Sequence, residues 1–116
     1  MKLTGFVANP YAYMARASVF AVSSLWEGAS NVVIEALATG TPVVAYRCPT
    51  GIAEVVAREA LVATGDVEGL ARAILMQISQ PRQAEVFKAQ AARYSLAASL
   101  EAYIDLFRKT LAAPPV

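Results

Sequence analysis

Two glutamates with seven residues between them, Glu27 and Glu35, are the side chains of this sequence best suited to chemistry. Glu27 lies in a glycine-containing turn, and Glu35 lies one to two turns into the helix that is predicted to follow. A helix start offers unpaired backbone N–H groups and the positive end of a dipole, so it attracts phosphate. Carboxylates beside it accept hydrogen bonds from sugar hydroxyls. The pattern therefore suggests a site for a sugar attached to a diphosphate.

The residues between the two glutamates suit a helix start, since they are small or polar: Gly28, Ala29, Ser30 and Asn31. Because Cβ bonds tilt towards a helix N-terminus, Glu35 leans back towards the loop that carries Glu27. Both carboxylates can then face one cleft at the carboxyl edge of a sheet, where open α/β sheets bind ligands. In the structural alternative, Glu35 belongs to the solvated face of an amphipathic helix, Glu27 is a favourable charge near a helix start, and Ser30 is an ordinary N-cap. Spacing alone favours this alternative.

The elements that must position the glutamates follow from apolar runs and turn residues. Near-continuous apolar runs predict strands buried on both faces at Val19–Val22 and Pro42–Tyr46. The helix between them, about Asn31–Thr39, should stop at Gly40. Further elements are predicted as strands at Leu3–Val7 and Ala60–Thr64, and as short helices at Tyr11–Ala17 and Ile52–Arg58. This alternation predicts a parallel sheet of about four strands, covered on both faces.

After Gly65 the pattern becomes entirely helical, and Asp66 is a suitable N-cap. The first of three helices should bury one apolar face, formed by Val67, Leu70, Ala71, Ile74, Leu75 and Ile78. The other two are predicted at about Arg82–Tyr94 and Leu96–Leu111. The last has an Asp105–Lys109 pair and an apolar face of Leu100, Tyr103, Ile104, Phe107 and Leu111. We therefore expect a single α/β domain over 1–116, with the sheet and site in 1–65 and helices in 66–112.

Composition narrows the classes of function. The 116 residues suffice for one small domain, and a hydrophobic content of 57% implies a compact core or an apolar surface for a partner. A net charge of +1 gives no general attraction to nucleic acid or acidic membranes. The absence of histidine excludes Ser-His-Asp and Cys-His catalysis and histidine-based zinc sites, and no dense acid cluster suggests a metal. The single cysteine, Cys48, fits a reducing, cytoplasmic location.

Several motifs in order resemble the second domain of GT-B glycosyltransferases, in particular the retaining group called family 4 or group 1. The E-x7-E pattern falls on Glu27 and Glu35, and the resemblance extends from Leu3 to about Ser79. The other matching positions are Gly28 in the turn; Ala38, Gly40, Pro42, Val43 and Val44 at the helix-to-strand join; Gly51 and Glu54; and Gly65, Asp66, Leu70 and Ala71. The resemblance implies a partial GT-B domain with a three-layer, Rossmann-like parallel sheet and extra C-terminal helices.

The resemblance also implies a role for each site residue. Glu27 would contact hydroxyls of the donor sugar and is the residue that we assign to catalysis, and Glu35 would contact the ribose of the nucleotide. Backbone N–H groups from the turn to the helix start would meet the sugar and the diphosphate; they belong to Gly28, Ala29, Ser30, Asn31 and Val32. The reaction would transfer a hexose from a nucleotide diphosphate sugar to an acceptor hydroxyl. The nucleotide sugar is a substrate, and no cofactor or metal is implied.

The departures from the family pattern matter equally. The family's second domain begins upstream with further strands and an Arg–Lys pair that neutralises the leaving diphosphate, and Lys2 matches neither position. The acceptor-binding first domain, on which the family's last helix packs, has no counterpart here. We therefore expect an N-terminally truncated chain whose partner is the missing domain or another chain. Any membrane association would come through that domain, and the chain alone should be inactive.

Four alternatives stay open at this point. The chain could be a non-catalytic nucleotide-sugar-binding or interaction module, oligomeric through a free sheet edge. It could be a remnant of a GT-B epimerase, although the expected histidines are absent. A receiver domain fits poorly, because Ser23 and Ser24 follow the strand where aspartates are needed. A dinucleotide-binding fold also fits poorly, because its G-x-G-x-x-G motif is absent from the sequence.

Among lesser candidates for the site, Gly51 offers a second helix start, and Tyr11, Tyr13 and Met14 are interpreted as core or interface filler.

Overall fold

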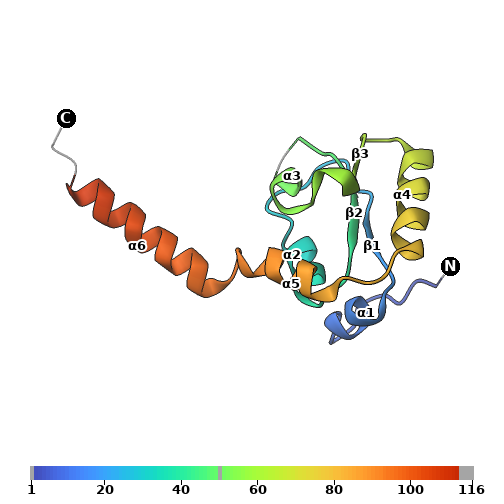
Figure 1. Ribbon diagram of the computed structural model, residues 1–116, viewed down its shortest axis with the longest axis horizontal. Helices are drawn as coiled ribbons and strands as arrows, with labels where there is room; N and C mark the ends of the chain where they lie inside the picture. Colours follow the sequence, from blue (N-terminus) through green and yellow to red (C-terminus); the bar gives the residue numbers. More distant parts are fainter. Residues whose placement is uncertain (1, 50, 113–116) are drawn as a thin grey trace.

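A three-stranded parallel sheet forms the centre of the computed structural model, which describes residues 2–49 and 51–112 (Figure 1). Its strands are β1 (Phe20–Val22), β2 (Val43–Tyr46) and β3 (Leu61–Val62), in the order β1-β2-β3. The register places Phe20 opposite Val43 and Ala45 opposite Leu61. The predicted α/β class with a parallel sheet is thus confirmed.

The strand predicted at Leu3–Val7 is wrong. This segment is not a strand, its Leu3 and Phe6 are 84% and 98% exposed, and Gly5 has a φ of +63°. A left-handed glycine interrupts an extended segment, and a strand without a neighbour cannot satisfy its backbone hydrogen bonds. The part of the chain that the structure describes therefore has three of the roughly four predicted strands.

Burial differs between the strands because of their places in the sheet. The central strand β2 is buried at all four residues, as predicted. The edge strand β1 was also expected to be buried on both faces, yet Ala21 is exposed and only Val22 is buried. An edge strand has one free side, and the helix on the second face, α4, packs mainly on β2 and β3 rather than on β1. The double coverage expected from the sequence thus holds for β2 alone.

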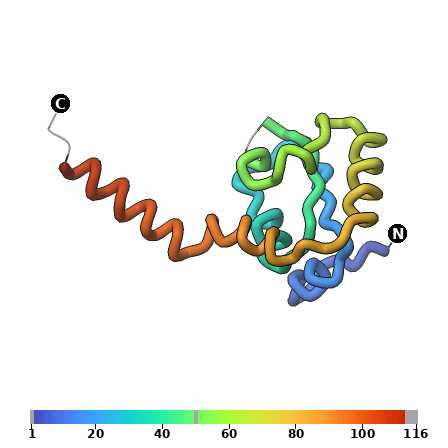
Figure 2. Tube along the Cα trace, in the orientation of Figure 1, coloured from blue at the N-terminus to red at the C-terminus, as the bar shows by residue number. Residues whose placement is uncertain are grey.

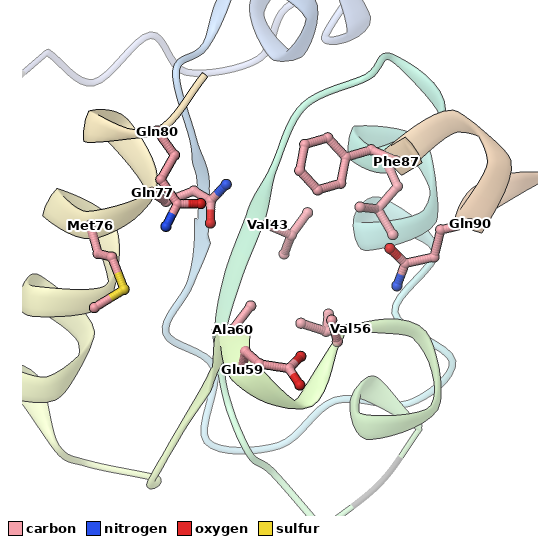
Figure 3. Close-up of a pocket in the computed structure, with 11 residues that line it drawn as sticks. Val43, Val56, Glu59, Ala60, Met76, Gln77, Gln80, Phe87 and Gln90 are labelled. Atoms are coloured by element: carbon pink, nitrogen blue, oxygen red, sulfur yellow. The ribbon is translucent and has the colours of Figure 1, made fainter. Parts of the chain in front are cut away.

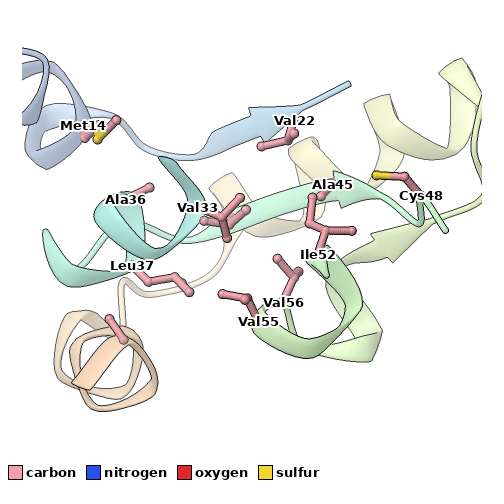
Figure 4. Close-up of a cluster of buried hydrophobic side chains, with 12 residues drawn as sticks. Met14, Val22, Val33, Ala36, Leu37, Ala45, Cys48, Ile52, Val55 and Val56 are labelled. Carbon is pink, nitrogen blue, oxygen red and sulfur yellow. The ribbon is translucent and has the colours of Figure 1, made fainter. Parts of the chain in front are cut away.

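Helices cover the two faces of the sheet unequally. On one face lie α2 (Asn31–Ala38), α3 (Ile52–Val55) and α5 (Ala84–Ala92), and on the other lies α4 (Val67–Ser79), as Figures 1 and 2 show. The larger core lies on the first face, where Val33 and Leu37 of α2 meet Ala45 of β2 and Ile52 of α3 (Figure 4). The 3₁₀ turn η1 (Arg58–Ala60) leads from α3 into β3.

The helix α4 buries a narrower face than the one predicted, since only Leu70 and Ile74 of that face pack against the sheet. Its N-cap is confirmed, since the Asp66 carboxylate accepts a hydrogen bond of 2.8 Å from the Gly69 N–H. Leu70 packs with Val44 and Tyr46, but Val67, Leu75 and Ile78 are exposed. Only a narrow row of residues can reach a sheet that is three short strands wide, so the rest of the predicted apolar face stays in solvent.

The C-terminal end of α2 is fixed by a Schellman motif. Gly40 has a φ of +74°, its N–H donates to the Leu37 carbonyl at 2.8 Å, and the Thr41 N–H donates to the Ala36 carbonyl at 3.0 Å. This pair of bonds is the pattern of a helix that ends on a left-handed glycine. The stop predicted at Gly40 is therefore confirmed.

Arg82, between α4 and α5, joins the ends of α1 (Tyr11–Arg16) and α2. Its guanidinium donates to the carbonyls of Gly40 at 2.9 Å and Ala15 at 3.0 Å, and to Thr41 Oγ1 at 3.2 Å. Thr41 is fully buried and donates in turn to the Met14 carbonyl at 2.6 Å. A guanidinium suits this place, because helix C-termini carry partial negative charge and expose unpaired carbonyls. The sequence indicated none of these contacts.

The last helix, α6 (Leu96–Ala112), stands away from the body of the molecule (Figures 1 and 2). None of its residues is buried, although the predicted pair is present, with Lys109 Nζ 2.6 Å from Asp105 Oδ2. Its apolar face, including Leu100, Tyr103 and Phe107, is exposed. Within residues 2–49 and 51–112, the helices are too short or too polar to span a membrane.

Replacing Arg82 by alanine should lower the free energy of unfolding by about 2 kcal/mol, because carbonyls of α1 and α2 lose a charged donor. Urea denaturation followed by circular dichroism measures the change. The matched control is Arg93→Ala, which removes an exposed guanidinium with no hydrogen bond seen among the described residues. Equal losses in the two variants would contradict the role given to Arg82.

Candidate functional site

The loops that follow β1 and β2 meet at the carboxyl edge of the sheet. A Cβ atom added at Gly51 would lie 2.8 Å from the carbonyl oxygen of Gly28 and 3.6 Å from the Cα of Ala29. Position 51 therefore needs a glycine because of this close approach. The contact brings the start of α3 against the turn that precedes α2.

Ser30, the residue before α2, has a strained backbone and an unsatisfied side chain. Its φ of +42° and ψ of +55° are left-handed, which a non-glycine residue adopts only at a cost. Its hydroxyl oxygen is buried, has no hydrogen-bond partner among residues 2–49 and 51–112, and does not cap the helix. The ordinary N-cap role considered for Ser30 is therefore wrong. Strain and buried unpaired polar groups together are typical of functional sites.

The first turn of α2 contains backbone N–H groups that have no acceptor within the helix. The carbonyl of Ser30 accepts from Val33 N–H at 2.9 Å and from Ile34 N–H at 3.5 Å. The N–H groups of Asn31 and Val32 precede these and have no carbonyl within the helix to reach. Asn31 is exposed and Val32 is half-buried. An anion at the helix start would meet these two donors and the positive end of the helix dipole.

Glu35 is half-buried and has a partner that the sequence did not indicate. The hydroxyl of Tyr11, the first residue of α1, donates to Glu35 Oε1 at 3.5 Å. Tyr11 was interpreted as filler, whereas Met14 of the same helix is buried in the core as interpreted. Contact between residues 24 apart in the sequence leaves no local pattern, so only the structure could show it.

Two other polar side chains near the site have different environments. At the end of α2, the hydroxyl of Thr39 donates to the Ala36 carbonyl at 2.7 Å and lies 3.1 Å from Thr41 Oγ1, so it belongs to the helix end. Glu27 is half-buried in the loop, beside Trp26, which is 75% exposed. The loop thus presents a carboxylate next to an exposed aromatic ring.

Helix α5 and Tyr94, which follows it, hold α3 in place beside the site. The Tyr94 hydroxyl donates to the Glu54 carbonyl at 2.8 Å, and the Gln90 amide donates to the Val55 carbonyl. These bonds fix the C-terminal end of α3, while Gly51 at its other end rests on the loop of Gly28. The start of α3 is thereby held against the turn.

A separate cavity lies away from these loops. It has a volume of about 180 Å³ and reaches Val43 and Ala60, at the beginnings of β2 and β3 (Figure 3). Its lining also includes the side chains of Glu59, Gln77, Gln80, Phe87 and Gln90. It therefore lies at the opposite end of the strands from Ser30. In the described ranges, no group of three or more His, Cys, Asp or Glu side chains could hold a metal ion.

These observations define an α/β domain in which a helix N-terminus meets the carboxyl ends of parallel strands, the edge at which open α/β sheets bind ligands. The model of the family described as "Glycosyl transferases group 1" matches residues 1–80, and the chain belongs to this family.

Two curated proteins share part of this sequence. An uncharacterized glycosyltransferase of Methanocaldococcus jannaschii is 42% identical over 57 residues, which are 49% of this chain and 14% of that protein. The second is the Campylobacter jejuni N-acetylgalactosamine-N,N'-diacetylbacillosaminyl-diphospho-undecaprenol 4-alpha-N-acetylgalactosaminyltransferase. It is 48% identical over 52 residues, which are 45% of this chain and 14% of that protein. The chain therefore matches only a small part of the length of these relatives.

Replacing Ser30 by glycine should raise the free energy of unfolding by about 1 kcal/mol, because it removes a left-handed non-glycine residue and a buried unpaired hydroxyl. Urea denaturation measures the gain. Ser24→Gly in the same loop is the control; Ser24 has a negative φ, so the substitution should bring no gain. A loss of stability in Ser30→Gly would show that the serine is not strained.

Proposed function

We propose that this chain is the donor-binding part of a retaining glycosyltransferase. The intact enzyme would transfer a hexose from a nucleotide diphosphate sugar to an acceptor hydroxyl. The observation that carries the proposal is the strained start of α2, where Ser30 has a φ of +42° and a buried, unpaired hydroxyl, in a member of the group 1 family.

Each group at the site has one proposed task. Glu35 accepts hydrogen bonds from the ribose, and Glu27 accepts them from hydroxyls of the donor sugar and is the proposed catalytic residue. The backbone N–H groups from Gly28 to Val32 meet the sugar and the diphosphate. Their position at a helix N-terminus supports this assignment, since such a terminus favours negative charge.

The site supplies only part of what the reaction needs. Departure of a nucleoside diphosphate requires stabilisation of the negative charge that develops, and cations usually contribute to it. The start of α2 offers a dipole and N–H groups, but no basic residue lies between Ser23 and Tyr46. We propose that the cations and the acceptor site come from another part of the protein or from another chain. The exposed apolar face of α6 supports this need for a partner.

The choice of sugar is guided by the relative from Campylobacter jejuni, which is named as an N-acetylgalactosaminyltransferase. This name makes the nucleoside diphosphate derivative of N-acetylgalactosamine a donor to test together with those of unmodified hexoses.

Glu35→Gln should weaken the binding of a nucleoside diphosphate about tenfold, because one charged hydrogen bond is worth about 1.5 kcal/mol or more. UDP, GDP and ADP would each be titrated into the 116-residue chain by calorimetry. Glu101→Gln, on the exposed face of α6, is the matched control and should leave the affinity unchanged. Absence of binding by all three nucleotides, together with a stable dimer, would support a non-catalytic interaction module instead.

The purified 116-residue chain should turn over no nucleotide sugar above background, because the proposal places the cations for the leaving diphosphate and the acceptor site in another part of the protein or in another chain. Release of UDP or GDP from the corresponding hexose and N-acetylhexosamine nucleotides, with simple sugars as acceptors, is the measurement. Measurable release that disappears in Glu27→Gln would contradict the need for a second part.

A further inference from the structure

The segment Asn9-Pro10-Tyr11 sets the position of Tyr11 at the first turn of α1. The Asn9 side chain accepts from the Ala12 N–H at 3.3 Å, and the Pro10 carbonyl accepts from the Met14 N–H at 3.1 Å. The proline has a φ of −66°, which suits the entry to a helix. The helix therefore begins at Tyr11 for local reasons.

The other end of α1 is fixed by contacts that do not involve Glu35. Thr41 Oγ1 donates to the Met14 carbonyl at 2.6 Å, Arg82 donates to the Ala15 carbonyl at 3.0 Å, and the Met14 side chain is buried in the core. Thr41 follows the C-terminal end of α2, and Arg82 also donates to the Gly40 carbonyl at that end. These contacts join the C-terminal ends of the two helices and help to set the place of Tyr11 relative to Glu35.

Across this pair, the Tyr11 hydroxyl reaches Glu35 Oε1 at 3.5 Å. An ionised carboxylate only accepts hydrogen bonds, so the phenol must be the donor. The bond takes up one carboxylate oxygen of Glu35. Its length is that of a loose bond, which is common for hydrogen bonds in ligand-free sites.

We propose that Tyr11 is a positioning residue, which holds Oε1 of Glu35 so that the second oxygen is presented to the ribose hydroxyls; this inference rests on the proposed function. A carboxylate held in one orientation loses little conformational entropy when it accepts from a diol. If the hydroxyls are missing, a held acceptor stays unpaired, whereas a mobile one turns to water. Tyr11 thus increases the selectivity for ribose over deoxygenated sugars.

The experiment compares UDP with 2′,3′-dideoxyuridine diphosphate, titrated by calorimetry into the 116-residue chain and into Tyr11→Phe. The dissociation constant of the dideoxy nucleotide divided by that of UDP measures the selectivity for ribose. This ratio should fall at least threefold in Tyr11→Phe, while the urea midpoint stays the same. Tyr13→Phe is the matched control, because Tyr13 lies on the same helix, is 58% exposed and makes no side-chain hydrogen bond in the described part of the chain; its ratio should not change. In a Glu35→Gln background, Tyr11→Phe should have no further effect on the ratio.

The outcomes separate this inference from the proposed function. If the unmodified chain binds UDP and Tyr11→Phe leaves the ratio unchanged, the positioning role alone is overturned. This includes the case in which both nucleotides lose affinity equally. Failure of the unmodified chain to bind UDP, GDP or ADP overturns the proposed function and the positioning role together.

Discussion

The burial of β2 on both faces is the constraint on which the rest of the structure depends. Its four residues lie between α4 on one side and α2, α3 and α5 on the other. A parallel strand needs such cover on both faces, and its helical connections return the chain to the same end of the sheet. As a result, the loops after β1 and β2 emerge at one edge. The contact between Gly51 and Gly28 is the direct consequence of this arrangement.

Features set by neighbouring residues were predictable from the sequence. The apolar run of β2, the glycine stop of α2 and the Asp66 cap depend on contacts within a few positions, and all three are present. The segment Leu3–Val7 has strand-like residues but no strand beside it, so composition was misleading there. The apolar face of α4 was misjudged because helical spacing shows amphipathicity, whereas the width of the sheet decides how much of it is buried.

The candidate site was predictable as a set of residues but not as a geometry. The order of motifs indicated Glu27, Glu35 and the turn between them. It could not indicate the left-handed backbone of Ser30, because serine at a helix start normally predicts a cap. It also could not indicate Tyr11 or Arg82, whose partners lie 24 and 42 residues away in the sequence. These long-range bonds join α1 to α2, the helix that carries Glu35.

The helix α6 presents an apolar face that is not buried within the described residues. Its exposed apolar face and its distance from the sheet show a surface for which the described residues provide no cover (Figure 1). Under the proposed function, binding of a donor uses the loops at the carboxyl edge. Transfer would also need charge stabilisation and an acceptor site from another part of the protein or from another chain.

The most direct test locates a bound nucleotide by recording ¹H–¹⁵N NMR spectra of the chain during a titration with UDP. The largest changes in amide shift should lie in residues 27–35 and at Gly51. Changes concentrated instead around Gln77 and Gln80, which line the separate cavity, or along α6, would contradict it.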